Sequence, residues 1–261
     1  MIVLFTDFGS DDIYIAQMKA VLLQQTASGT PIHDLLHRVP NFDAKAGAHL
    51  LAALQGGFPA GSVFLAVIDP GVGSTREPVV LEADGKAYVG PDNGLLSVVA
   101  ARAAKARTWR IVWRPPAHSV SFHGRDLFAP VAAWIAAGNL AKDSLEEMPA
   151  LDVNLGPGDL AEVIYIDHYG NVLTGLRACN VSLSAKIEIG GHQVAYARVF
   201  ADVPVNNAFW YENSVGLVEV AVNGGSAAEM LRLQAGDAIR VLSGASAQSR
   251  ATDRRRDLID P

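Results

Sequence analysis

Apolar runs alternate with helical patterns along the first half of this chain. Short apolar runs, typical of buried strands, occupy residues 1–5, 63–68, 78–82, 87–89 and 110–113. Helices are predicted between and after them, at residues 14–24, 42–54, 95–104 and 126–136. Strands that alternate with helices indicate an α/β domain with a doubly wound, mainly parallel sheet. Ligands are expected at the carboxyl ends of its strands.

The pattern changes after Gly138. Residues 151–159 contain two glycines and a proline and look like a linker. Short strands punctuated by Gly and Asn are then predicted at residues 160–166, 181–189, 193–199, 217–222 and 238–242. This spacing suits a smaller all-β, barrel-like domain. We therefore predict an N-terminal α/β domain at residues 1–154, a C-terminal β-barrel domain at 155–245 and a polar tail at 246–261.

Composition narrows the class of protein. The chain has 261 residues, of which 50% are hydrophobic and 18% charged, as in globular proteins. A formal charge of −6 argues against nucleic acid as a partner, and no apolar stretch is long enough to span a membrane. The single cysteine, Cys179, excludes a disulfide within the chain and a paired-cysteine metal site. We expect a cytoplasmic protein.

Several common catalytic motifs are missing. The chain contains neither the Gly-x-Gly-x-x-Gly dinucleotide fingerprint nor the Gly-x-x-x-x-Gly-Lys-Ser/Thr phosphate loop. It also lacks the His-Glu-x-x-His zinc motif and the Gly-x-Ser-x-Gly nucleophile motif. The chemistry has to be sought in other residues.

Three predicted strands end at an aspartate that is followed closely by Gly or Pro: Asp7, Asp69 and Asp92. After Asp69, a glycine-rich turn leads to Arg76, whose guanidinium would stabilise a nearby carboxylate in its charged form. His123 lies at a strand-to-helix junction, where an imidazole could orient or deprotonate a water. Asp-Pro-Gly is also a common turn, and a single histidine is more often structural. The residues alone leave both interpretations open.

Five stretches resemble a known family and occur in its order. They are Thr6–Gly9, Asp69–Arg76, Gly90–Gly94, Phe122–Asp126 and Asp167–Asn171. The chain is similar through these motifs to the S-adenosyl-L-methionine hydroxide adenosyltransferases, which are relatives of the fluorinase and chlorinase. The similarity runs from residue 1 to about residue 243.

The resemblance implies a fold, an assembly and a reaction. It implies an α/β domain followed by a β-barrel domain, in a homotrimer whose active sites lie between one subunit's N-domain and a neighbour's C-domain. It implies attack of a water-derived hydroxide on the ribose C5′ of S-adenosylmethionine, giving adenosine and L-methionine with neither a metal nor a cofactor. A sulfonium leaves as a neutral thioether, so the enzyme needs mainly to position and activate water.

The resemblance also implies roles for single residues. Asp69, Arg76 and His123 would form the water-activating triad. The predicted substrate contacts are Asp7 to the ribose hydroxyls, Asp12 to the methionine ammonium, Phe42 to the ribose and sulfonium region, Tyr169 and Asn171 to the adenine, and Ser214 to the methionine carboxylate. From the residues alone, Asp12 could equally be a helix N-terminal charge and Phe42 a core aromatic.

Departures from the fluorinase pattern bear on the nucleophile. Gly124 stands where the fluorinase has a serine at the halide, and Asp69 stands where it has a tyrosine. Both differences favour water as the nucleophile. In the C-domain, residues 167–171 form a loop one residue shorter than the fluorinase's, and Val215 replaces an arginine. Our interpretation is an S-adenosylmethionine hydrolase, with a chloride-using halogenase and a non-catalytic sensor of adenosine or S-adenosylmethionine as alternatives.

Overall fold

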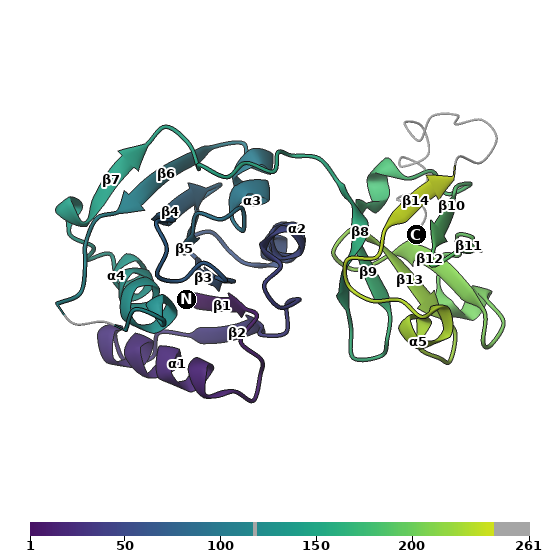
Figure 1. Ribbon diagram of the computed structural model, residues 1–261, viewed down its shortest axis with the longest axis horizontal. Helices are drawn as coiled ribbons and strands as arrows, with labels where there is room; N and C mark the ends of the chain where they lie inside the picture. The colour runs from purple at the N-terminus through teal and green to yellow at the C-terminus, as the bar shows by residue number, and fades with distance from the viewer. Residues whose placement is uncertain (117–118, 243–261) are drawn as a thin grey trace, which may run out of the picture. The chain divides into compact units, whose positions relative to one another are not determined.

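The computed structural model describes residues 1–116 and 119–242, and these form two compact units (Figure 1). The first unit runs from Met1 to Leu160, and the second begins at Ala161. The predicted polar tail at 246–261 lies outside the described residues. In the part that is described, no helix is long and apolar enough to cross a membrane.

The first unit contains a seven-stranded sheet with the order β2-β1-β3-β5-β4-β6-β7. Its strands are β1 (Ile2–Thr6), β2 (Ile32–Leu36), β3 (Val63–Val67), β4 (Pro78–Ala83), β5 (Lys86–Pro91), β6 (Ala106–Ile111) and β7 (Leu145–Met148). Its helices are α1 (Ile13–Gln25), α2 (Ala44–Leu54), α3 (Ser97–Arg102) and α4 (Ala129–Ala137). The π-helical turn η2 (Gly124–Phe128) leads directly into α4.

The sheet is parallel on one side and antiparallel on the other. Strands β2, β1, β3 and β5 pair in parallel, whereas β4 pairs antiparallel with both β5 and β6, and β6 with β7. The α/β class and the parallel-rich sheet are thus confirmed. The parallel strands β1 and β3 have every side chain buried, as strands covered on both faces require.

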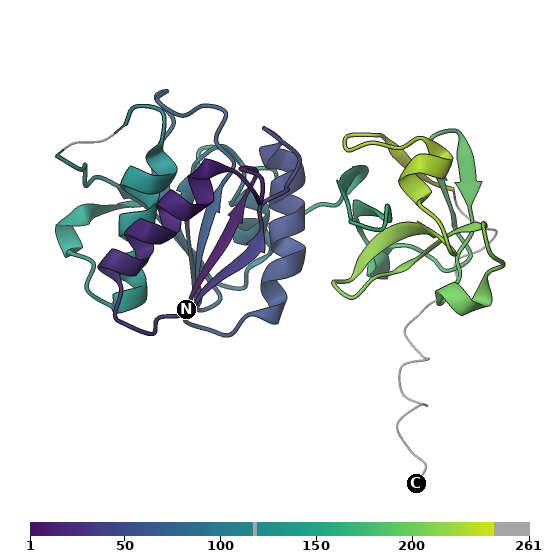
Figure 2. The same cartoon turned by 90° about the horizontal axis from the view of Figure 1, so that it is seen from below.

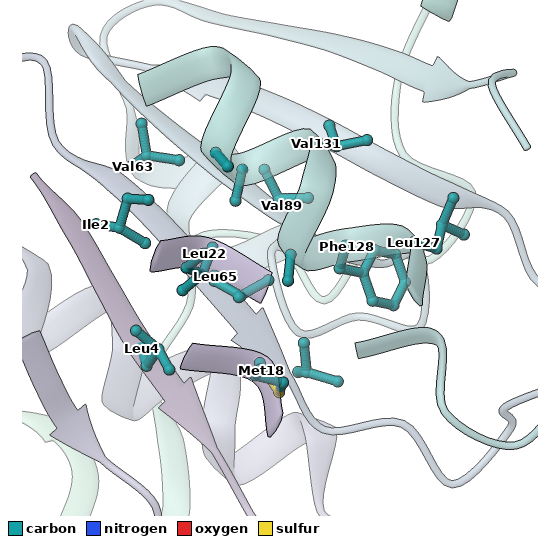
Figure 3. Packing of buried hydrophobic residues seen from close by; sticks show 14 of the residues in the cluster. Ile2, Leu4, Met18, Leu22, Val63, Leu65, Val89, Leu127, Phe128 and Val131 are labelled. Carbon is teal, nitrogen blue, oxygen red and sulfur yellow. The ribbon is translucent and has the colours of Figure 1, made fainter. Parts of the chain in front are cut away.

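Helices α1 and α4 cover one face of the sheet, and α2 lies on the other (Figures 1 and 2). Figure 3 shows the core on the first face, where Met18 and Leu22 of α1 and Phe128 and Val131 next to them pack on alternate residues of the central strands. This apolar layer holds β1 and β3 rigidly. The loops that carry Asp7 and Asp69 begin at the carboxyl ends of these packed strands.

Most predicted elements of this unit are present, with shifted ends. The strand predicted at residues 110–113 is instead β6, at Ala106–Ile111. Its outward arginines, Arg107 and Arg110, pair with glutamates of β7, and these charges hide the strand pattern. Strands β2 and β7 were not predicted, because His33 and Asp34 interrupt the apolar residues of β2 and Glu146 and Glu147 interrupt those of β7. Both lie at edges of the sheet, where charged residues are common.

The second unit contains two small sheets, with the orders β12-β13-β9-β8 and β11-β10-β14. The strands are β8 (Leu160–Ile166), β9 (Val172–Arg177), β10 (Lys186–Ile189), β11 (His192–Val194), β12 (Ala208–Glu212), β13 (Leu217–Val222) and β14 (Ile239–Leu242), and α5 (Ala227–Leu231) is a short helix. Bridges from Glu162 to Ala238 and from Tyr196 to Trp210 link the sheets, but no closed barrel forms among the described residues.

The core of the second unit surrounds Trp210, which is fully buried and donates its indole N–H to the carbonyl of Ala185 at 3.0 Å. Strands β8 and β13 have the predicted bounds. The strand expected at 181–189 begins only at Lys186, because Ser182 and Ala185 close a turn before it. Strands β9 and β12 and helix α5 were not predicted.

Candidate active site

The carboxyl end of β3 carries a compact cluster of Asp69, Arg76 and His123. Arg76 binds both carboxylate oxygens of Asp69, and its Nε donates to Oδ1 at 2.6 Å. Its Nη2 lies 3.3 Å from His123 Nδ1. Because a guanidinium has only donors, Nδ1 is the acceptor in this contact. The three residues predicted to form a triad are therefore in direct contact.

Burial strengthens this cluster. The side chain of Asp69 is 4% exposed and that of Arg76 is 10% exposed. The guanidinium also lies over the ring of Phe128, 5.4 Å from its centroid. Two parallel N–H···O contacts fix the plane of the carboxylate, and the surrounding low dielectric strengthens each contact. The contacts within the triad are thus formed without a bound substrate.

A tight turn brings Arg76 back to Asp69. Val72 N–H donates to the carbonyl of Asp69, and Ser74 N–H to that of Gly71. Gly73 has φ +79°, and a Cβ there would lie 2.9 Å from the carbonyl oxygen of Val120. Only glycine fits this conformation and this space. The glycine-rich turn predicted from the sequence thus brings the arginine back onto the acid.

The π-helical turn η2 presents His123. The residue caps the turn, and Asp126 fixes the preceding loop by accepting the N–H of Ser119 at 2.7 Å. Arg125 pairs with Asp126 and lies over the ring of Phe122. Single π turns occur frequently at functional sites. Here the turn widens the start of α4 at the point where the imidazole meets Arg76.

A small cavity of about 140 Å³ opens on this cluster. Its walls include Asp69, His123 and Gly124, together with the rings of Phe8, Tyr14 and Phe122. The rings of Phe8 and Tyr14 each pack edge to face against Phe122. Two larger hollows of about 540 and 630 Å³ lie elsewhere in the unit, and none of the predicted site residues lines them. We place the site at the smaller cavity because Asp69 and His123 line it and Arg76 contacts both of them.

Gly124 belongs to the apolar wall. A Cβ at this position would lie 3.3 Å from Met18 Sδ and 3.5 Å from the Phe8 ring. A serine would therefore need its neighbours to move by a few tenths of an ångström. The packing explains why glycine suits this position, and it leaves the cavity without a hydroxyl at residue 124.

Asp7 directly follows β1, which is the neighbour of β3 in the sheet. Its Oδ2 accepts the backbone N–H of Phe42 at 2.9 Å. Burial, and then the negative charge of Asp69, raise the pKa of Asp7 above its ordinary value, although the Phe42 N–H opposes this. The two carboxylates therefore face a common region, as the parallel sheet order predicts for neighbouring strand ends.

Phe42 and Asp12 have different surroundings from the triad. Phe42 is 72% exposed and adopts a left-handed backbone with φ 64°, which is uncommon for an aromatic residue and is found preferentially at functional sites. It is not a core residue. Asp12 is exposed and caps α1, its side chain accepting the N–H of Ile13 at 2.6 Å. Its capping role is thus present, whether or not it also meets an ammonium.

The second unit holds the remaining predicted contacts. Asp167 organises the loop between β8 and β9, since its carboxylate accepts the N–H groups of Tyr169 and Asn171, both at 2.9 Å, and the Asn171 amide at 3.0 Å. Tyr169 is 75% exposed, whereas Asn171 is buried. This leaves Tyr169 as the loop's accessible aromatic surface.

Ser214 is exposed in the turn between β12 and β13. Asn213 closes this turn by accepting the N–H groups of Val215 and Leu217, and donates to the buried Glu219, which also accepts from Tyr211. Burial raises the pKa of Tyr211. Its hydrogen bond to Glu219 and the negative charges of Glu219 and Asp167 raise it further. The Ser214 turn lies beside the end of β9, whereas the Asp167 loop lies beside the end of β13, since Leu217 pairs with Arg177 and Val220 with Val172 in this antiparallel sheet.

One supporting residue, Asn93, escaped our sequence analysis, in which Asp92 appears only as an aspartate at a strand end. Asn93 donates to the carbonyl of Ile68 at 2.8 Å, directly before Asp69, and so holds the end of β3. Asp92, its neighbour, accepts the N–H of Asp152 at 2.7 Å and fixes the segment that follows β7. The Gly90–Gly94 motif pointed to this place, but a motif does not tell which partner each side chain takes. Its role here is support.

Among residues 1–116 and 119–242, no group of three or more His, Cys, Asp or Glu side chains is arranged to hold a metal ion. The acid of the triad uses both of its oxygens on Arg76.

Fold and site together define the class of protein: an α/β unit that presents a buried acid–guanidinium–imidazole triad at its strand ends, followed by a β unit with two ordered loops. Comparison with known proteins identifies the family. The N-terminal domain model of the SAM hydroxide adenosyltransferases matches residues 2–145, and the C-terminal domain model matches residues 161–240. The chain belongs to the SAM hydroxide adenosyltransferase family.

Individual relatives agree with this assignment. The chain is 38% identical over 255 residues to the (R)-S-adenosyl-L-methionine hydrolase of Thermus thermophilus, covering 91% of this chain and 97% of that one. It is 25% identical over 290 residues to the fluorinase of Actinopolyspora mzabensis, covering 92% and 96%. The crystal structure of an uncharacterized conserved protein from Thermotoga maritima is 31% identical, covers 92% of this chain with all of its own length, and has a TM-score of 0.84.

Proposed function

We propose that this protein hydrolyses S-adenosyl-L-methionine to adenosine and L-methionine. The contact of Asp69, Arg76 and His123 at the carboxyl end of β3, in a chain of this family, carries the proposal. The greater similarity to curated hydrolases than to fluorinases favours water over halide.

The chemistry balances without a co-reactant. A water oxygen forms a bond to the ribose C5′ while the C5′–S bond breaks, and its electron pair stays on sulfur as the neutral thioether of methionine. The water proton passes to the triad and then to solvent. Because the leaving group needs no protonation and no charge stabilisation, we also propose that neither a metal nor an organic cofactor takes part.

The residues divide the work by their positions. The triad orients and activates the water inside the cavity walled by Phe8, Tyr14 and Phe122. Asp7 accepts hydrogen bonds from the ribose hydroxyls, and Phe42 packs near the ribose and sulfonium. Tyr169 and Asn171 contact the adenine, Ser214 the methionine carboxylate and Asp12 its ammonium. These contacts follow from the motif matches, and the exposure of Phe42, Tyr169 and Ser214 supports them.

Isotopic oxygen tests the reaction directly. Purified protein is incubated with S-adenosylmethionine in ¹⁸O-labelled water, with and without chloride, and the nucleosides are analysed by mass. We expect labelled 5′-oxygen in adenosine and methionine in equal amount, independent of chloride. A 5′-chloroadenosine product would establish the halogenase alternative, and bound but unchanged substrate would establish the sensor.

We propose a homotrimer in which a neighbour's second unit completes each site, as the family resemblance implies. Subunit mixing tests this. An Asp69→Asn protein and an Asn171→Ala protein, each inactive alone, should regain partial activity when unfolded and refolded together, because some sites then combine two intact halves. Light scattering should give three times the subunit mass, and a monomer that is fully active would contradict the shared site. We also propose a cytoplasmic location, which the lone cysteine Cys179 suits.

Asp12→Asn separates the capping role of Asp12 from its proposed contact with the substrate. Asparagine caps helices about as well as aspartate, so the melting temperature should stay within about 1 °C of the wild type. Loss of the charge should raise KM for S-adenosylmethionine about three- to tenfold, as expected for a charge-assisted contact. Steady-state kinetics and a thermal melt measure the two effects. An unchanged KM would leave Asp12 as a cap alone.

The Asp7→Asn variant should be more stable than the wild type at neutral pH but should bind adenosine more weakly. Its raised pKa means that the folded state disfavours the charged carboxylate. A carboxyl group whose pKa is higher in the folded state than in the unfolded state contributes stability that is complete below its unfolded pKa. This contribution is lost as pH rises through the folded pKa. The variant should therefore melt above the wild type at neutral pH, and this gain should vanish in acid. Binding of adenosine should weaken, because an amide accepts fewer hydrogen bonds than a carboxylate. A variant less stable than wild type at pH 7 would contradict the pKa direction.

A further inference from the structure

A series of hydrogen-bonded side chains, separate from the triad, ends at Thr6, the residue before Asp7. Thr6 Oγ1 is 2.8 Å from His37 Nδ1, and His37 Nε2 is 2.9 Å from Asp34 Oδ1. The ammonium of Lys19 contacts the other oxygen of Asp34. Thr6 is fully buried and His37 is 6% exposed, whereas the Asp34 side chain is 43% exposed. This series of hydrogen bonds thus runs from the surface to the residue next to Asp7.

The donors and acceptors of this chain fit one direction. A carboxylate only accepts, so His37 Nε2 carries a proton and donates to Asp34. The backbone N–H of Phe8 donates to Thr6 Oγ1 at 3.2 Å. In the tautomer with Nδ1 unprotonated, the Thr6 hydroxyl donates its own proton to His37 Nδ1. With a neutral imidazole, every donor in the chain has an acceptor.

The same residues join the two loops that face the ribose. Gly9 N–H donates to the carbonyl of His37 at 2.6 Å, and Val39 N–H donates to the carbonyl of Thr6 at 3.4 Å. The first loop carries Asp7, and the second continues to Phe42, whose N–H donates to Asp7. Thr6 and His37 therefore stand where the end of β1 meets the end of β2. A loss of their contact would act on the orientation of the Asp7 carboxylate.

Charge at the outer end supports this arrangement. Although burial opposes it, the hydrogen bonds from Lys19 and His37 hold the pKa of Asp34 below its ordinary value. A charged Asp34 keeps the proton of His37 on Nε2, and this leaves Nδ1 free to accept from Thr6. The tautomer of the imidazole is thereby set from the surface.

We propose that Thr6, His37 and Asp34 form a positioning relay that holds the Asp7 carboxylate in the orientation needed to bind the two ribose hydroxyls of the substrate. The proposal rests on the proposed function, since it assigns Asp7 to the ribose. None of the three residues touches substrate. They act through Asp7 and through the loop that carries Phe42.

Two substitutions at Thr6 test the inner link. Thr6→Val keeps the shape and removes the hydroxyl, whereas Thr6→Ser keeps the hydroxyl. Thr6→Val should weaken adenosine binding about tenfold, the equivalent of one buried hydrogen bond, and Thr6→Ser should restore it to within about twofold of wild type. KM should rise with kcat changed less. Binding of 2′,3′-dideoxyadenosine, which lacks both ribose hydroxyls, should be the same for all three proteins.

Thr174 provides a matched control. It is also fully buried, accepts the N–H of the residue two positions on, Leu176, and donates to a partner in a neighbouring strand, Val218. Thr174→Val removes the same chemistry from the second unit, so it should lower the melting temperature about as much as Thr6→Val. Its ratio of adenosine to dideoxyadenosine affinity should stay at the wild-type value.

The outer link is tested by Asp34→Ala. If the relay acts as one unit, this exposed change should also weaken adenosine binding, and the Thr6→Val/Asp34→Ala double variant should lose no more than the larger single loss. Calorimetric titration of adenosine into the full-length protein measures all affinities.

The outcomes separate this inference from the proposed function. A wild-type protein that hydrolyses S-adenosylmethionine, together with a Thr6→Val variant of unchanged ligand discrimination, would overturn the relay alone. Equal weakening of adenosine and dideoxyadenosine would also overturn it, because the residues would then be merely structural. A wild-type protein that binds adenosine but releases no methionine would overturn the proposed hydrolase function. The ratio of adenosine to dideoxyadenosine affinity in the variants would still test the relay.

Discussion

Replacement of Asp69 by asparagine should lower kcat for S-adenosylmethionine hydrolysis by about 10²- to 10⁴-fold, the usual contribution of a group that activates water. The change keeps the size of the side chain but removes its charge and one of the two acceptors that bind Arg76. Single-turnover kinetics measure the chemical step. His123→Ala should produce a loss of the same order, because the imidazole lines the same cavity and contacts the same guanidinium.

Both variants should still bind. We expect adenosine affinity to remain within about threefold of wild type, since the contacts assigned to the nucleoside lie on other residues. Asp92→Asn is the matched control, because Asp92 also follows a strand of this sheet and is buried, but its carboxylate accepts backbone N–H groups far along the chain. It should retain near-normal kcat. Efficient hydrolysis by both the Asp69 and His123 variants would remove the triad from the mechanism.

Replacement of Arg76 by methionine should lower the free energy of unfolding by about 3–5 kcal/mol and abolish activity as well. The apolar stem and the contact with Phe128 can be retained, but Asp69 is then left as a buried carboxylate without its guanidinium. Denaturant unfolding of the full chain measures the loss. The penalty comes mostly from the uncompensated charge and not from the ion pair itself.

Two comparisons make this prediction specific. An Asp69→Asn/Arg76→Met double variant should be more stable than Arg76→Met alone, because no charge is then stranded in the interior. Arg107 offers the exposed counterpart, since it also pairs with a carboxylate, Glu147, and lies over an aromatic ring, Trp109. Both side chains of that pair are about 60% exposed, so Arg107→Met should cost at most about 1 kcal/mol. Equal losses at the two arginines would show that burial of the Asp69 pair is unimportant.

Much of the first unit could be predicted from local pattern. The central parallel strands β1, β3 and β5 are apolar runs followed closely by an aspartate, because a strand buried on both faces can tolerate a polar residue only where it emerges. The edge strands β2 and β7 could not be found in this way. They cover little apolar surface and carry charges, so their place depends on hydrogen bonds to neighbours that are distant in sequence. In the second unit, strands β9 and β12 were missed although they pack tightly.

The candidate site divides in the same way. Asp69 and Arg76 are seven residues apart, and the intervening glycines in the sequence already indicated a turn that could bring them together. His123 is 47 residues from Arg76, and His37 is 31 residues from Thr6. Only the order of strands and the packing of η2 and α4 against them decide that these side chains meet. The sequence by itself determined which residues are chemically able to act and where strands end, since those depend on short-range patterning. The tertiary structure alone decided which of them share a cavity, because proximity across the sheet arises from the cooperative burial of its two faces.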